Sequence, residues 1–495
     1  MPTVSFYKIG LLLSLVALSS SLAGLGYYYQ NRTVGLNNQV ASLNTQNDSQ
    51  HDQIDSLKGQ IANLTEQIKN LSSNIDQLQS TNTQLLNQII QLRNQLGGTG
   101  GLCSSGKTLT IGELTDLSDG LSNIGIKVRE SSLLAVDDVN SLLSSGGCNL
   151  RFSLAVDDYA LDNSRALSDL QSFSASGIQI VVGPLNSGVA QFILPFANSN
   201  HIVLVSPSSS STALGIPNDY LFRTAPTDAA QGRADARMMF DRGARALIIV
   251  QRHDGYGISV GDATAMKFTS LGGKVIDTIQ YDATSSSTTD FTPVLQTVQN
   301  DFNQNVGTYG PDKIALYFVS FEELGSLVIQ ASHQSGFPRT QLPWFGADGT
   351  TLDPVLTGNA TTGPLLVQLR YTSPQFYTVN NTKTLQFYHL FNSLYPGQSC
   401  DQYCLGAYDD VWVSALATLQ AGSYDGTKIQ AIISTVASNY YGLTGWTEFD
   451  TNGDRVPPSY QIWKIAIEGS ASEPSWVLAG TWDASSDSIT WLAPP

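Results

Sequence analysis

Hydrophobic residues recur through the first hundred residues at alternating steps of four and three. One row of this repeat contains Val40, Asn47, Ile54, Ile61, Ile68, Ile75, Asn82, Ile89 and Leu96, and the other contains Leu36, Leu43, Gln50, Leu57, Leu64, Leu71, Leu78, Leu85 and Leu92. This spacing is typical of the seam of a left-handed coiled coil. We therefore predict a helical stalk over residues 36–96, followed by a flexible Gly-rich linker at 97–107.

The residue types in the seam indicate how the stalk associates. Isoleucine in the first row and leucine in the second favour a parallel dimer, with a three-stranded assembly as the alternative. Asn47 and Asn82 interrupt the isoleucine row, where an asparagine that meets its symmetry mate fixes the register; local fraying beside Gln50 is the other interpretation of Asn47. Residues beside the seam are mostly Gln and Asn, so no charge pattern favours pairing with a chain of different sequence. We expect self-association.

An uncharged apolar run at residues 9–29 precedes the stalk. It is about 20 residues long, which suits a bilayer core. Three tyrosines at 27–29 favour a retained anchor, because tyrosine prefers the membrane interface. A signal peptide cleaved near Ser19–Ala23 is the alternative. We expect residues 1–35 to anchor the protein in the cell membrane, with the rest of the chain outside the cytoplasm.

Beyond the linker, short apolar runs alternate with stretches of helical pattern. Strands are expected at Leu109–Glu113, Arg151–Val156, Ile178–Pro184, His201–Pro207, Ala246–Gln251, Lys274–Tyr281, Lys313–Ser320 and Pro343–Gly349, and helices between the first of them at Val128–Leu143 and Ser164–Ser176. This alternation predicts an α/β protein with doubly wound parallel sheets. About 390 residues exceed one hydrophobic core, so we expect two lobes, one formed by 108–227 and 371–446 and the other by 228–370 and 447–495.

Ligands of such sheets bind beyond the carboxyl ends of the strands. Two turns there, GPLNSG at 183–188 and SPSSSST at 206–212, offer serine hydroxyls and backbone N–H groups, which suit a carboxylate. Asp348, after a later strand, would bind an ammonium group of the same ligand, and Tyr256 would close over it. The sequence therefore predicts a cleft for a small zwitterion.

Several segments resemble the periplasmic branched-chain amino-acid (leucine, isoleucine, valine) binding proteins, which are type I substrate-binding proteins of ABC importers. In chain order these segments are VVGPLNSGVA (181–190), LVSPSSSSTAL (204–214), FRTAPTDAAQG (222–232), GYG (255–257), TTDFTPVL (288–295) and FDTNGDR (449–455). The resemblance implies a two-lobed type I periplasmic-binding-protein fold, an ABC permease as partner, and an amino acid or a similar solute as ligand.

The resemblance also implies ligand contacts for particular residues. The serine of the first turn corresponds to Ser187, and the pair in the second turn to Ser209 and Ser210. The cleft tyrosine and the late acidic residue correspond to Tyr256 and Asp348, although the family often has Glu at the latter position. Phe321 stands in the turn where the family has aromatic residues, and this chain departs from the tyrosine-rich pattern there.

Charge and cysteine content narrow the class further. With 41 acidic against 25 basic residues the net charge is -16, so a nucleic-acid partner is not expected. The four cysteines predict two locally closed disulfides, Cys103 to Cys148 and Cys400 to Cys404, because the exterior is oxidising. Glycosylation sequons lie beyond the apolar run, at Asn31, Asn47, Asn63, Asn70, Asn359 and Asn380.

We expect neither catalysis nor a bound metal or cofactor. None of the five histidines belongs to a recognisable catalytic motif, and no phosphate-binding loop is present. Asp450, Asn452 and Asp454 are spaced like the start of a calcium loop but lack its glycine and closing carboxylate, so they predict a turn. A cell-surface structural protein and a sensory protein using the same fold are the alternatives to a transport function.

Overall fold

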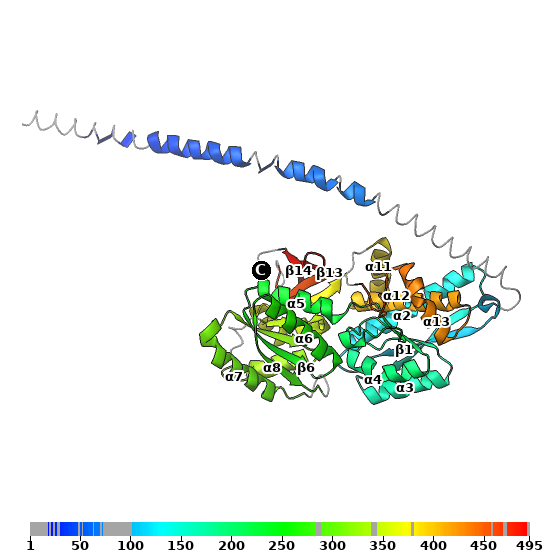
Figure 1. Ribbon diagram of the computed structural model, residues 1–495. Helices are drawn as coiled ribbons and strands as arrows, with labels where there is room; N and C mark the ends of the chain where they lie inside the picture. Colours follow the sequence, from blue (N-terminus) through cyan, green and yellow to red (C-terminus); the bar gives the residue numbers. More distant parts are fainter. Residues whose placement is uncertain are drawn as a thin grey trace, which may run out of the picture. The chain divides into compact units, whose positions relative to one another are not determined.

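Figure 1 shows the computed structural model, which describes residues 18, 21–22, 25–26, 30–47, 50–51, 53–62, 64–69, 72, 101–283, 289–337, 344–377, 381–456, 459–468 and 473–492. The chain divides into an N-terminal unit, residues 1–81, and a globular unit that begins at residue 82.

The described residues of the N-terminal unit are helical, including 30–47, 53–62 and 64–69. The seam side chains within these ranges are exposed, from 46% for Ile54 to 66% for Ile68. The helical conformation of this part of the stalk agrees with the prediction, whereas its pairing stays a prediction. Most of the run at 9–29 and the seam after residue 72 lie outside the described residues. Within the described part of the chain, no helix has both the length and the apolar character that crossing a bilayer requires.

The first lobe is built on a parallel sheet with the strand order β2-β1-β3-β4-β5. Its strands are β1 (Thr108–Thr115), β2 (Arg151–Asp158), β3 (Ile180–Val182), β4 (Val203–Ser206) and β5 (Leu221–Arg223). One face is covered by α2 (Ser122–Ser145), α11 (Thr382–Leu394), α12 (Gln402–Ala421) and α13 (Gly426–Ser438), and the other by α3 (Asn163–Ala175) and α4 (Ser187–Ser199) (Figure 1). Both faces are buried at the central strands β3 and β4, which explains why these two strands are nearly continuous apolar runs.

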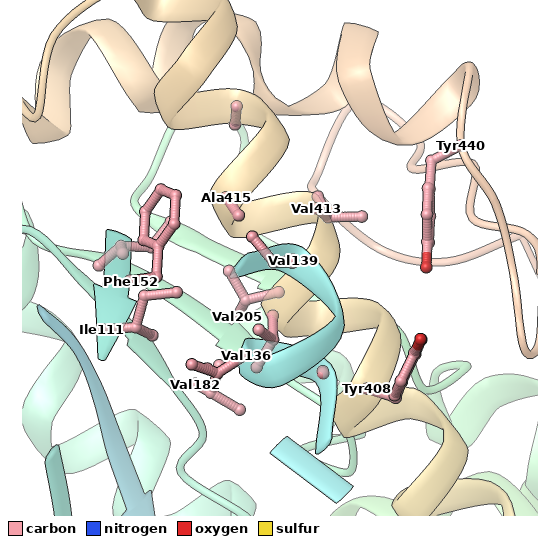
Figure 2. Packing of buried hydrophobic residues seen from close by; sticks show 14 of the residues in the cluster. Ile111, Val136, Val139, Phe152, Val182, Val205, Tyr408, Val413, Ala415 and Tyr440 are labelled. Carbon is pink, nitrogen blue, oxygen red and sulfur yellow. The ribbon is translucent and has the colours of Figure 1, made fainter. Parts of the chain in front are cut away.

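The larger core of this lobe lies between the sheet, α2 and α12. Figure 2 shows Val136 and Val139 of α2 beside Val182 and Val205 of the sheet, and Tyr408 of α12 belongs to the same cluster. The two valines of α2 are three residues apart, which places them on one helical face. This layer fixes α2 and α12 over the sheet and so holds the loops at its carboxyl edge.

The second lobe has a mixed sheet with the order β15-β14-β13-β10-β9-β8-β6-β7. Its strands are β6 (Ala246–Arg252), β7 (Lys274–Tyr281), β8 (Ile314–Val319), β9 (Trp344–Gly346), β10 (Thr372–Tyr377), β13 (Ser459–Ala466), β14 (Ser475–Asp483) and β15 (Ser488–Trp491). Helices α5 (Asp228–Asp241) and α6 (Gly255–Ser270) cover one face, and α7 (Thr292–Tyr309), α8 (Leu324–His333), α9 (Pro354–Gly358) and α10 (Thr362–Gln368) cover the other. Strand β13 runs antiparallel to β10 and to β14.

The chain passes between the lobes three times. It enters the second lobe between β5 and α5, returns after β10, and enters the second lobe again before β13. Strand β10 pairs with β9 and β13, so residues 372–377 belong to the second sheet, although the sequence-based boundary at 371 assigned them to the first lobe. A small hairpin of β11 (Tyr441–Gly442) and β12 (Gly445–Trp446) precedes the last crossing.

Both predicted disulfides are present, Cys103 with Cys148 and Cys400 with Cys404. The first ties the start of the globular unit to the segment before β2, across 45 residues, and the second spans four residues at the start of α12. Of the sequons, Asn359 is exposed, while Asn63, Asn70 and Asn380 lie outside the described residues.

We predict that the longer disulfide contributes more to stability. Closing a loop restricts the unfolded chain, by about 4 kcal/mol for 45 residues and about 2 kcal/mol for four. Replacing Cys103 and Cys148 by serine should therefore lower the free energy of unfolding about twice as much as replacing Cys400 and Cys404. Guanidinium denaturation of the two double variants measures this, and equal losses would contradict the prediction.

Candidate functional site

Two loops of the first lobe meet at the carboxyl edge of its sheet. Ser187 begins α4, and its Oγ accepts hydrogen bonds from the backbone N–H groups of Ser210 (3.0 Å) and Ser211 (3.1 Å). A hydroxyl has two acceptor lone pairs and one proton, so both acceptor positions are filled and the O–H stays free to donate. The structure thus brings Ser187 and Ser210 together, with a donor available to a bound anion.

The hydroxyls of Ser209 and Ser210 differ in their hydrogen bonding. Ser209 Oγ donates to the carbonyl oxygen of Pro184 (2.8 Å), so it ties one loop to the other instead of facing a ligand. Ser210 is 4% exposed, and its Oγ has no partner of ordinary hydrogen-bond geometry in the described part of the chain, although it lies close enough to the Asp228 carboxyl group to lower the pKa of that group. Gly183 fits between these loops because a Cβ there would lie 2.2 Å from the carbonyl oxygen of Leu114.

Arg223, at the end of β5, holds the second serine loop from behind. Its Nη1 donates to the carbonyl oxygens of Ser209 (3.2 Å) and Ser211 (2.7 Å), and its Nε donates to Asp454 Oδ1 (2.7 Å). Arg223 is fully buried, so Asp454 supplies the counter-charge that such a cation requires. Drawing the carbonyl groups toward Arg223 leaves the N–H groups of the loop directed toward Ser187.

In the second lobe, Asp348 is the centre of a buried hydrogen-bond network. Its Oδ1 accepts from Tyr256 Oη (2.7 Å) and Gln231 Nε2 (2.9 Å), and its Oδ2 accepts from the hydroxyl of Tyr403. Burial raises the pKa of Asp348, and these three donors counteract the increase. Tyr403 belongs to α12 of the first lobe, so this carboxyl group also joins the two lobes.

An aromatic wall continues from this network. The ring of Tyr256 stacks on that of Phe321 with centroids 4.9 Å apart, and the guanidinium of Arg252 lies 4.3 Å from the Phe321 centroid. A Cβ on Gly349 would approach both Phe321 and Tyr256 within 3 Å, so glycine allows the loop after β9 to reach the wall. Predicted site residues Tyr256, Phe321 and Asp348 therefore form one group.

A further acidic residue, Asp228, was not singled out from the sequence. It lies in the first turn of α5, where an acidic residue ordinarily complements the helix dipole. It is fully buried, its backbone N–H donates to the carbonyl oxygen of Ser210 (2.9 Å), and neither carboxyl oxygen has a partner of ordinary hydrogen-bond geometry in the described structure. Burial is the main cause that raises the pKa of Asp228 to about 7; the Ser210 and Ser259 hydroxyls oppose this rise, and the charge of Asp348 adds to it. Asp228 thus connects the serine loops to the acidic group.

The lobes also touch at the edge of the cleft. Glu322, next to Phe321, accepts from the backbone N–H of Asn123 (2.9 Å) at the start of α2, and Thr212 N–H donates to Ser259 Oγ (3.0 Å). A cavity of about 180 Å³ lies between the lobes, lined by residues on both sides of Ser187 and by Arg252 and Asp254. A wider groove of about 760 Å³ runs along α6. All of the predicted site residues lie in the described part of the structure, and none of them lines this groove.

Known proteins share both the sequence pattern and the fold. Residues 127–468 match the model of the family described as the receptor family ligand binding region. The chain belongs to this family. Members of this receptor ligand-binding family bind ligands and are not enzymes, in agreement with the lack of a catalytic motif in the sequence.

Relatives of this chain occur in several organisms. An uncharacterised protein of Methanocaldococcus jannaschii is 29% identical over 406 residues, which cover 78% of this chain and 93% of that protein. A Leu/Ile/Val-binding protein homologue of Brucella melitensis is 24% identical, over 69% of this chain and 85% of that protein. The crystal structure of the leucine-binding protein LivK from Thermotoga maritima has a TM-score of 0.62 at 19% identity, covering 75% and 98% of the two chains. The last similarity shows the two-lobed type I fold.

We predict that Asp454→Asn destabilises the protein by about 3 kcal/mol or more, because it leaves the buried Arg223 without a counter-charge. The control is Asp312→Asn, which removes an exposed partner of Lys313 at 3.8 Å and should change stability by less than about 1 kcal/mol. Urea denaturation of both variants measures the difference. Similar, small effects would show that the Arg223 ion pair does not hold the loop.

Proposed function

We propose that this chain is the substrate-binding protein of an ABC importer and that it captures an amino acid between its lobes. The observation that carries the proposal is the meeting of two opposite kinds of group. Ser187 and the neighbouring loop present free donors from the first lobe, whereas Asp228 and Asp348 present buried carboxyl groups from the second. Donors suit a carboxylate and carboxyl groups suit an ammonium, so together they match an α-amino acid.

The buried charges support a cationic group in the ligand. Burial disfavours the ionised carboxylates and raises the pKa values of both Asp228 and Asp348, and the charge of Asp348 adds to the rise at Asp228. An ammonium group placed between them would compensate this charge and favour the ionised forms. A neutral or purely anionic solute would leave the acidic groups uncompensated.

Because the two kinds of group come from different lobes, the ligand would bind the closed arrangement more tightly than an open one. That difference in affinity is what drives closure in a two-state protein. The names of the Leu/Ile/Val-binding relative and of LivK support an amino acid as the ligand class. Closure would then present the outer surfaces of both lobes to an ABC permease.

The N-terminal sequence supports a surface location. The apolar run at 9–29 would anchor the protein in the cell membrane, and the stalk would hold the lobes outside the cytoplasm. The exposed seam side chains, Leu57, Ile61 and Leu64 among them, would be covered by the same face of a second copy, since their spacing is that of a two-stranded coiled coil.

We predict that an amino acid binds this protein with an affinity that falls about tenfold per pH unit below 7. Asp228 must lose its proton to face the ammonium, and its pKa of about 7 places that loss in this range, where the ligand itself does not titrate. Calorimetric titration with a panel of amino acids between pH 5 and 8 measures it. Asp228→Asn should weaken binding and flatten the profile.

The control for this prediction is Asp219→Asn. Burial raises the pKa of Asp219 to about 6, but this residue caps the start of β5 and does not face the site, so its variant should keep the profile of the parent.

The proton that Asp228 holds in the folded state also has a stability consequence. Because the folded pKa is raised, the parent loses stability as the pH rises from about 4 to 7, and Asp228→Asn should unfold at a higher temperature than the parent at pH 8. Absence of binding by every amino acid would refute the proposed function.

We predict that the detergent-solubilised full chain is a dimer and that Ile61→Glu with Ile68→Glu makes it a monomer. The two substitutions place four like charges in the seam of a pair, where the parent has exposed isoleucines. Gln53→Glu with Gln60→Glu adds the same charge beside the seam and should leave the dimer intact. Sedimentation equilibrium measures the mass of each, and a monomeric parent would refute the pairing.

A further inference from the structure

The cavity of about 180 Å³ between the lobes is mostly polar, and its apolar side chains are those of Leu161 and Ala283. Asn186 and Gly188, which flank Ser187, line it from the first lobe, and Arg252, His253 and Asp254 line it from the second. Asp254 lies two residues before Tyr256, so the cavity adjoins the group that would hold the ammonium and carboxylate. If the proposed function holds, this cavity is the place for the side chain of the amino acid.

Asn186 lines this cavity and carries an unused donor. Its Oδ1 caps α4 by accepting from the backbone N–H of Val189 (3.0 Å), which fixes the orientation of the amide. Its Nδ2 is buried and has no hydrogen-bond partner in the described residues, and the whole side chain is 4% exposed. A buried N–H group without an acceptor is unfavourable, so a ligand that places an acceptor at this point would bind more tightly than one that does not.

The charged groups around the cavity are already paired. Arg252 donates through Nε to Asp254 Oδ2 (2.8 Å) and through Nη1 to Glu323 Oε1 (2.6 Å). His253 Nδ1 lies 3.0 Å from Asp282 Oδ1. A ligand carboxylate would be repelled by Asp254 and Asp282, and a ligand cation has no lone pair to accept from Asn186 Nδ2, so neither charged group suits this cavity. A neutral group has no such conflict.

We propose that the side chain of the ligand ends in a neutral carboxamide or a similar group with one acceptor and donors. Its carbonyl oxygen accepts from Asn186 Nδ2, and its N–H groups donate to the carboxylates that line the opposite wall, of which Asp254 is the nearer to Tyr256. An aliphatic side chain would leave the Asn186 amide without a partner and place apolar surface against charged groups. The ligand class is therefore glutamine-like or asparagine-like amino acids, in contrast to the leucine named for a structural relative.

The test compares ligands on the full chain by calorimetric titration. Alanine reports the ammonium and carboxylate contacts alone, since its side chain does not reach the cavity. Glutamine or asparagine should bind at least tenfold more tightly than leucine and than glutamate. Alanine binding together with a preference for leucine would overturn this inference while leaving the proposed function standing, whereas no binding of any amino acid would overturn both.

Two variants isolate the donor. Asn186→Asp and Asn186→Ser both keep an oxygen that caps α4, so the fold should be retained, but both remove the N–H group. The ratio of carboxamide to alanine affinity should fall at least tenfold in each. The affinity for alanine itself should be nearly unchanged in Asn186→Ser, whereas the added negative charge beside Ser187 should also weaken alanine binding in Asn186→Asp. Asn198→Asp, whose amide oxygen accepts from Tyr220 at the far end of α4, should keep the parent ratio. An unchanged ratio in both Asn186 variants would refute the role of this cavity.

Discussion

The buried ion pair between Arg223 and Asp454 is the constraint on which the candidate site depends. Arg223 ends the last strand of the first sheet, and Asp454 lies on the segment that leads back to the second sheet, 231 residues later. The same guanidinium binds the carbonyl oxygens of Ser209 and Ser211. One cation therefore fixes a chain crossing and the peptide groups that would face a ligand carboxylate, so the site and the crossing cannot move independently.

In the second lobe, Asp348 has the same kind of structural role as the Arg223 ion pair. It accepts hydrogen bonds from Tyr256 and Gln231 of its own lobe and from Tyr403 of the other. Tyr256 also stacks on Phe321, whose neighbour Glu322 contacts the start of α2. Aromatic stacking and the hydrogen-bond network thus rigidify one wall of the candidate site and make its geometry depend on the distance between the lobes. A closing motion would assemble the wall and the serine loops together.

The fold could be predicted from the sequence because both sheets are buried on two faces. Runs such as ALIIVQ in β6 are continuous apolar segments, which single out strands without any long-range information. The location of Ser187, Ser210, Tyr256 and Asp348 at the carboxyl edges of the sheets could be predicted because they follow strand ends, while their contacts with a ligand stay a prediction. Asp228, Arg223 and Tyr403 could not be predicted, since their roles come from partners far along the chain, and β10, with Pro374 in it, lacks the apolar run that marks the other strands.

The distribution of hydrogen bonds refines which acidic group would receive an ammonium. Three donors already occupy Asp348, so its remaining capacity to accept is small, whereas Asp228 has only the nearby hydroxyls of Ser210 and Ser259, neither of which has ordinary hydrogen-bond geometry in the described structure. An ammonium would gain its strongest hydrogen bond at Asp228 and a longer-range attraction from Asp348. The sequence predicted the direct contact at Asp348. We therefore propose a division in which Asp348 positions Tyr256 and Tyr403 and contributes charge, while Asp228 makes the contact.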